Sequence, residues 1–201
     1  MFTEQQEKWL KRVEEIFFRF GIKSLTMDDV ARELGISKKT LYQFVENKDD
    51  LVLKVVQRHV AEEKIQGECF HLEASDAIEE ILAVIRHVQG EMQRIKSNIL
   101  FDMQKFHREA WDELSAYQRG HMHQRVRENL ERGRKEGLYR TDFDLDIVAR
   151  LHVAESFLLL DEDWFPRPPY SLETLFREYL LYYLHGVVSE QGLKILKAKL
   201  S

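Results

Sequence analysis

Apolar residues recur every three or four positions along most of the chain, which is the spacing of one side of an α-helix. The first run extends from about Thr3 to Phe20 and stops at Gly21. The three prolines all lie within residues 166–169, so the rest of the chain is free to be helical. Including two short helices between residues 26 and 45, the pattern predicts an all-α protein of about nine helices, the others covering residues 49–66, 76–93, 97–107, 109–136, 144–160 and 171–189.

The two short helices carry start and stop signals. Thr26 occupies the N-cap position of the first helix, and Asp28 and Asp29 place negative charge in its first turn. Gly35 can adopt the left-handed conformation that ends a helix, and Ser37 can cap the second helix. These signals predict two helices joined by a tight turn.

The second short helix has one apolar and one polar side. Leu41, Phe44 and Val45 share the inward side. The outward side is cationic and rich in hydrogen-bonding groups, and it comprises Lys38, Lys39, Thr40, Tyr42 and Gln43. This surface suits contact with DNA, and the alternative interpretation is an ordinary helical hairpin with a solvated basic side.

The stretch from Gly21 to Leu51, GIKSLTMDDVARELGISKKTLYQFVENKDDL, strongly resembles the DNA-binding domain of TetR-family transcriptional repressors. The resemblance covers about residues 10–55 and implies a helix-turn-helix whose second helix lies in the major groove of DNA. Base edges or flanking phosphates are then the expected partners of Lys38, Lys39, Thr40 and Gln43. Ser37 is also expected at the DNA, while Thr26, Tyr42 and Lys48 match the positions that grip the backbone.

One position departs from the family pattern. The chain has Val45 where the family usually carries a large aromatic residue. The smaller side chain is expected to change the packing beneath the second helix and not its DNA contacts. Phe17, Phe18 or Phe20 would fill the volume.

Composition places the protein among soluble globular chains. Of its 201 residues 44% are hydrophobic and 32% charged, and no apolar run reaches the length of a membrane span. The single cysteine, Cys69, excludes an internal disulfide and fits a reducing compartment. The polar, acidic N-terminus is unlike a signal peptide. We therefore expect a cytoplasmic protein that does not contact the membrane.

Net charge limits how DNA can be bound. The whole chain has a formal charge of -5, and residues 1–66 hold twelve Lys or Arg against twelve Asp or Glu. The DNA-binding part is thus neutral, and its affinity must come from the placement of a few lysines. A homodimer would double that cationic surface.

The sequence divides into an N-terminal helix-turn-helix DNA-binding domain over residues 1–48, a connecting helix over 49–66, and an effector-binding and dimerisation domain over 67–201. The last two long helices are apolar on most sides, which points to a partner subunit. The resemblance implies a four-helix bundle between two subunits. The expected interface residues are Phe176, Leu180, Tyr183, Leu184 and Val187; a wholly intramolecular bundle is the alternative.

The resemblance also implies a small effector held among the middle helices. Aromatic residues with a few polar anchors suit an apolar or amphipathic molecule. The candidates in this region are Phe101, Phe106, Tyr117, His152 and Phe157. Each of them is also compatible with an ordinary position in the core.

Metal and cofactor sites are not expected. His121 and His123 are two residues apart, so on a helix their side chains diverge by roughly 200° and do not share a metal. The chain lacks the sequence motifs of phosphate loops, nucleophile elbows and zinc proteases, which argues against an enzyme. A helical scaffold or a small all-α enzyme without DNA binding remains the alternative class.

The sequence as a whole predicts a sequence-specific transcriptional regulator, a repressor that a small-molecule effector releases from DNA. The protein is expected to act as a homodimer on a palindromic operator. Its two recognition helices would enter successive major grooves about 34–36 Å apart.

Overall fold

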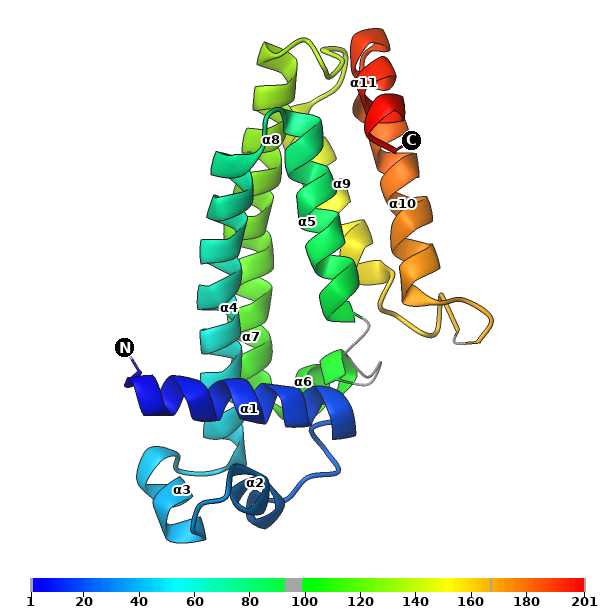
Figure 1. The fold of residues 1–201 in the computed structure, drawn as a ribbon. Coiled ribbons are helices and arrows are strands. Elements are labelled where there is room, and N and C mark those ends of the chain that lie inside the picture. Colours follow the sequence, from blue (N-terminus) through cyan, green and yellow to red (C-terminus); the bar gives the residue numbers. More distant parts are fainter. Residues whose placement is uncertain (1, 93–98, 167, 201) are drawn as a thin grey trace. The chain divides into compact units, whose positions relative to one another are not determined.

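The computed structural model describes residues 2–92, 99–166 and 168–200, which fold into helices joined by short connections (Figure 1). These residues contain no β-strand, and Tyr139 and Val188 form an isolated antiparallel bridge. The all-α prediction is confirmed. The helices are α1 (Glu4–Phe20), α2 (Met27–Leu34), α3 (Lys38–Phe44), α4 (Lys48–Glu73), α5 (Ala77–Met92), α6 (Ile99–Phe106), α7 (Arg108–Tyr117), the π-helix η1 (Gln118–Met122), α8 (His123–Lys135), α9 (Leu145–Leu158), α10 (Leu172–Val187) and α11 (Glu190–Leu200).

The helices form two compact units. Unit 1 contains the described residues 2–63 and 99–117, and unit 2 contains 64–92 and 118–200 within the described ranges. The division falls inside α4 and at the junction of α7 with η1. Helices α6 and α7 therefore group with the N-terminal helices, whereas the boundary expected from the sequence placed them in the C-terminal domain.

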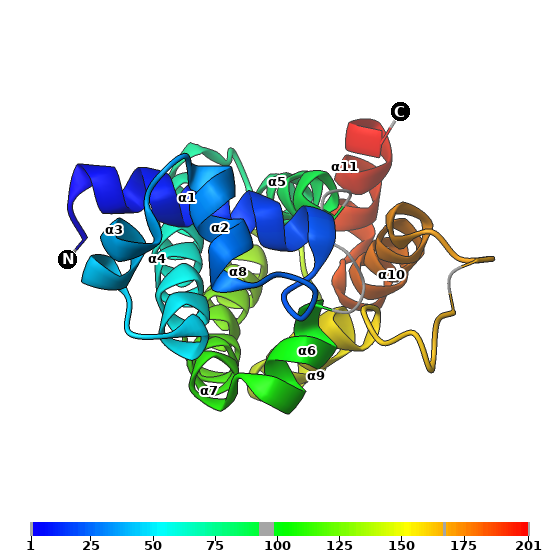
Figure 2. The same ribbon diagram turned by 90° about the horizontal axis from the view of Figure 1, so that it is seen from below.

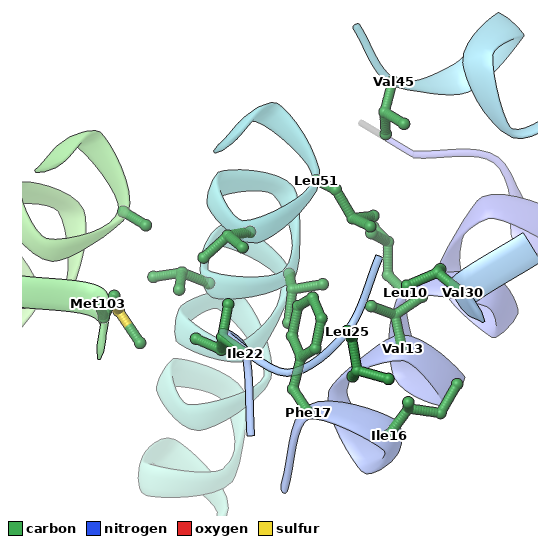
Figure 3. Packing of buried hydrophobic residues seen from close by; sticks show 14 of the residues in the cluster. Leu10, Val13, Ile16, Phe17, Ile22, Leu25, Val30, Val45, Leu51 and Met103 are labelled. Carbon is green, nitrogen blue, oxygen red and sulfur yellow. The ribbon is translucent and has the colours of Figure 1, made fainter. Parts of the chain in front are cut away.

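Unit 1 is built around one apolar cluster, shown in Figure 3. Side chains from α1, α2, α4 and α6 converge in it, together with residues of the loop between α1 and α2. Its labelled members are Leu10, Val13, Ile16, Phe17, Ile22, Leu25, Val30, Val45, Leu51 and Met103. Because the helix-turn-helix shares this cluster with α1 and α4, those longer helices hold it in place.

Three helical features differ from the sequence prediction. The helix expected over residues 109–136 is divided into α7, the π-helix η1 and α8, because π-turns occur as single turns inside longer helices and carry no start or stop signal in the sequence. Helix α4 continues to Glu73, beyond the expected residue 66. The additional helix α11 follows α10. It was not predicted because Gly192, in its first turn, has a low helix propensity.

Gly192 allows α11 to lie close to the backbone of residues 137–138. The Gly192 N–H donates to Ser189 Oγ at 3.0 Å, and the same hydroxyl donates to the Gly137 carbonyl at 2.7 Å. A Cβ atom on Gly192 would lie 2.0 Å from the Leu138 carbonyl oxygen. No side chain fits there without a backbone shift.

We expect Gly192→Ala to destabilise unit 2 by about 1–3 kcal/mol, because the added methyl group overpacks against a backbone carbonyl. Urea unfolding followed by circular dichroism measures the change. The matched control is Gly186→Ala in α10, where a Cβ meets nothing within 4 Å and alanine is the better helix former. Equal stability of the two variants would contradict the close packing of α11.

The five residues expected at a dimer interface lie inside the chain's own core. Phe176, Leu180, Tyr183, Leu184 and Val187 are each 6% exposed or less. They pack in two apolar clusters with residues of α5, α8, α9 and α11. In this conformation the chain itself covers these five side chains, and their place at a dimer interface stays a prediction.

The described helices differ from membrane-spanning helices. None of them combines the length and the apolar character needed to cross a bilayer.

Candidate nucleic-acid interface

The first helix of the helix-turn-helix begins at a reciprocal cap between Thr26 and Asp29. The Thr26 N–H donates to the Asp29 carboxylate at 3.0 Å, and the Asp29 N–H donates to the Thr26 hydroxyl oxygen at 3.2 Å. The Thr26 hydroxyl also donates to that carboxylate at 2.6 Å. These bonds lower the pKa of Asp29 and confirm the helix start predicted at Thr26.

The turn between α2 and α3 is closed by backbone hydrogen bonds. Gly35 adopts the left-handed conformation, with φ 67° and ψ 28°. Its N–H donates to the Arg32 carbonyl at 3.1 Å, and the Ile36 N–H donates to the Ala31 carbonyl at 3.1 Å. Ala31 is buried, and its small side chain permits the close crossing of the two helices.

The second helix, α3, is capped by Ser37. The Thr40 N–H donates to Ser37 Oγ at 3.0 Å, and the two hydroxyl oxygens are 2.8 Å apart. Leu41 and Val45 are buried beneath the helix. Val45 belongs to the same apolar cluster as Phe17, and Phe18 packs against that cluster.

The outward side of α3 presents Lys39, Tyr42 and Gln43 to solvent. Tyr42 is 43% exposed. Among the described residues, the Lys39 and Gln43 side chains have no hydrogen-bond or ion-pair partner. Figure 1 shows α2 and α3 together on one side of α1, and Figure 2 views these helices from that side. These three side chains are available to a ligand as large as DNA.

Lys38 has a partner within the protein. Its ammonium group lies 2.7 Å from the Asp28 carboxylate, and this hydrogen bond raises the pKa of Lys38. Both side chains are exposed, so water and salt screen the pair strongly. Lys38 can exchange Asp28 for a DNA phosphate at small cost.

Lys48 is tied to the loop before α2. Its ammonium group donates to the Leu25 carbonyl at 2.6 Å, and burial lowers its pKa while Asp102 and Asp49 act in the opposite direction. The side chain is half-buried. The ammonium group has two further N–H donors, so a contact with a DNA phosphate is compatible with this hydrogen bond, and that contact stays a prediction.

The five residues expected to hold an effector are divided between the two units. Phe101, Phe106 and Tyr117 belong to unit 1, and His152 and Phe157 belong to unit 2. Phe101 is 57% and Phe106 45% exposed, each with a lysine ammonium over its ring. Burial raises the pKa of Tyr117 above the usual range. No single unit holds all five.

His152 has aromatic partners that the sequence interpretation had not grouped with it. Its Nδ1 lies 2.8 Å from the Tyr179 hydroxyl oxygen, and its ring centroid is 4.0 Å from that of Tyr183. Burial lowers the pKa of His152 to about 4. The spacing of Tyr179 and Tyr183, four residues apart on one helix, signals that the two face the same neighbour.

The N-terminal part of the chain matches a known family. The family described as "Bacterial regulatory proteins, tetR family" matches residues 10–55. The regulator YvaF of Bacillus subtilis, an uncharacterized HTH-type transcriptional regulator, is 34% identical over 95 residues, which span 47% of this chain and 50% of YvaF. This chain thus aligns with only half of YvaF.

Two further comparisons extend over nearly the whole chain. The transcriptional repressor KstR2 of Mycolicibacterium smegmatis is 24% identical over 94% of each protein. A solved structure of a putative transcriptional regulator from Saccharomonospora viridis, in complex with choline, superposes with a TM-score of 0.73 at 18% identity. It covers 94% of this chain and all of that one, and at this identity the likeness concerns the fold.

Proposed function

The chain belongs to the TetR family of bacterial DNA-binding transcriptional regulators, and from this premise we propose that it is a homodimeric repressor that a small molecule releases from a palindromic operator. The observation that carries the proposal is the exposed side of α3. This side presents three exposed side chains, Lys39, Tyr42 and Gln43, on a helix whose other side is buried. The helix is short, capped and fixed to a larger core, as a reading element must be.

Each exposed group of α3 has a proposed role. Lys39 and Gln43 have the donors that recognise base edges in the major groove, and the Tyr42 hydroxyl suits a phosphate. Thr26, Ser37 and Thr40 use their hydroxyls within the protein, which orients the helices. We assign these three to positioning, with DNA contact limited to their remaining lone pairs.

We propose that the dimer forms through the exposed apolar residues of α9 and α10. Ile147, Leu151, Ala154 and Leu158 are exposed and recur on one side of α9 at intervals of four, three and four residues. Tyr182 on α10 is 70% exposed. Exposed apolar residues aligned along a helix mark an interaction surface. A twofold interface made of these residues would join two chains and leave the buried core residues of α10 in place.

The effector and the location of the protein are also proposed. The solved protein from Saccharomonospora viridis holds choline, so a chain of this fold can accommodate a small molecule. By analogy we place the effector site in unit 2. A cytoplasmic protein fits the role of a regulator that reaches chromosomal DNA.

The operator can be identified without knowing it in advance. We expect the purified protein to enrich a palindromic sequence from a pool of random duplex DNA, with half-sites about one helical turn apart. Gel retardation of the enriched duplex then measures specific affinity. Failure to enrich any sequence would favour the scaffold or enzyme alternative.

Lys39→Ala is expected to weaken operator binding about tenfold or more, because it removes a free cation from the reading side. Fluorescence anisotropy at several salt concentrations measures this affinity. If the slope of log affinity against log salt concentration falls by about one, Lys39 contacts a phosphate. If the slope is unchanged and the sequence preference relaxes, Lys39 contacts a base. The control is Lys11→Ala, an exposed lysine on α1. Equal affinities of the two variants would count against α3 as the reading helix.

A further inference from the structure

Tyr183 has a buried hydroxyl group without a hydrogen-bond partner. Within the described parts of the chain, the buried side-chain polar atoms that lack such a partner are Gln118 Nε2, His123 Nε2, Arg125 Nη2 and Tyr183 Oη, all of them in unit 2. Two of these have a charged neighbour, since His123 lies 3.0 Å from Asp146 and Arg125 lies 3.7 Å from Glu80. Folded proteins pair nearly all buried polar groups, so the phenol of Tyr183, 6% exposed, needs an explanation.

The hydrogen bonds of the neighbouring residues assign a tautomer to His152. The Tyr179 hydroxyl donates to the His152 carbonyl oxygen at 2.8 Å. The hydroxyl has one proton, so the 2.8 Å contact between His152 Nδ1 and the Tyr179 oxygen takes its proton from the imidazole. Nε2 of the neutral ring is then an acceptor. The cluster offers one acceptor nitrogen and the free phenol of Tyr183.

The surroundings of the cluster favour an uncharged partner. Tyr183 shares its apolar cluster with Ala149, Leu180, Leu184 and Val187. Burial raises the pKa of Tyr183 and lowers that of His152, so both groups are neutral near pH 7. An anion brought here would lose its hydration and meet the negative charge of Glu155, which acts on Tyr179.

We propose that Tyr183 and His152 are the polar anchors of the effector site in unit 2, and that the effector is an uncharged, largely apolar molecule whose carbonyl oxygen accepts a hydrogen bond from Tyr183. The inference rests on the proposed function in one respect, which is that an effector binds in unit 2. It adds the chemical class of the effector and the group that recognises it. A second polar group on the effector, such as a hydroxyl, would donate to His152 Nε2.

Three matched probes test the recognised group. They are 2-acetylnaphthalene, which is a ketone, 2-isopropenylnaphthalene, which has the same shape without the oxygen, and the 2-naphthoate anion. Binding of each to the full-length protein is measured by calorimetry for the wild type, Tyr183→Phe and the control Tyr170→Phe, an exposed tyrosine outside the cluster. Tyr183→Phe is expected to weaken ketone binding about tenfold and to leave the hydrocarbon unchanged. Tyr170→Phe should change neither, and the anion should bind least.

Stability provides a second measurement. Tyr183→Phe removes an unpaired buried hydroxyl, so without probe the variant should unfold at the same temperature as the wild type or higher. With the ketone present the order should reverse. The infrared carbonyl band of the bound ketone should move to lower wavenumber in the wild type only.

Defined results would overturn the proposal. They are equal ketone affinity in the wild type and Tyr183→Phe, tightest binding of 2-naphthoate, or no binding of any probe. DNA binding is measured separately on the enriched duplex. A protein that binds its operator but fails the probe test refutes the assigned anchors alone, whereas a protein that binds no DNA refutes the proposed regulator.

Discussion

Replacing Arg58 with alanine is expected to destabilise unit 1 by about 3–5 kcal/mol, because it leaves a buried carboxylate without its main cation. The Arg58 side chain is 7% exposed, and its Nη1 lies 2.9 Å from the carboxylate of Glu14. Its Nε is 3.6 Å from Glu7, and its Nη2 contacts Glu62. His59 also contacts Glu14, at 2.8 Å, which places the expected loss toward the lower end of the range.

Urea unfolding at pH 7, followed by the fluorescence of Trp9 and by circular dichroism, measures this loss. The control is Arg12→Ala, which removes an exposed ion pair with Glu15 and is expected to cost less than about 1 kcal/mol. The double variant Arg58→Met with Glu14→Leu should recover most of the stability, since it removes both buried charges together. A loss for Arg58→Ala no larger than that of Arg12→Ala would mean that the network does not hold α1 against α4.

Leu151→Glu is expected to produce monomers and to reduce operator affinity a hundredfold or more. Leu151 lies in the middle of the exposed apolar side of α9, where the proposed interface would bury the new carboxylate without a counter-ion. A monomer contacts only one half-site. The loss of the second half-site accounts for most of the expected change in affinity.

Sedimentation velocity at micromolar concentration gives the oligomeric state, and anisotropy with the enriched duplex gives the affinity. The matched control is Ile65→Glu, which places the same charge at another exposed apolar residue, on α4 and outside the proposed interface. It should remain a dimer and bind the operator. A monomeric wild type would refute the dimer, and a dimeric Leu151→Glu variant would assign the interface to another surface.

The helix-turn-helix was predictable because its signals are local. Thr26 and Ser37 act on amides three residues away, and Gly35 ends a helix through its own backbone conformation. Such interactions depend on neighbours in the sequence and need no distant partner. The helix boundaries in this part of the chain therefore agree with the prediction to within about a residue.

Longer helices show where this kind of prediction stops. An apolar stripe predicts that one side of a helix is buried, but it does not predict which residues or which subunit cover that side. The residues of α10 expected at a partner subunit pack inside their own chain. The effector candidates are divided between the two units for the same reason, because an aromatic residue in the sequence is compatible with a core, a surface or a pocket.

The sequence by itself determined the all-α class, the two capped helices α2 and α3, and the small set of cations and hydroxyls on α3, since each depends on spacing within a few residues. Only the tertiary structure decided that Lys48 is held by the Leu25 carbonyl, that Arg58 pairs with the buried Glu14, and that Tyr183 keeps an unpaired phenol beside His152. Those contacts join residues from 23 to 44 positions apart. Their existence depends on how the helices pack, which no local pattern specifies.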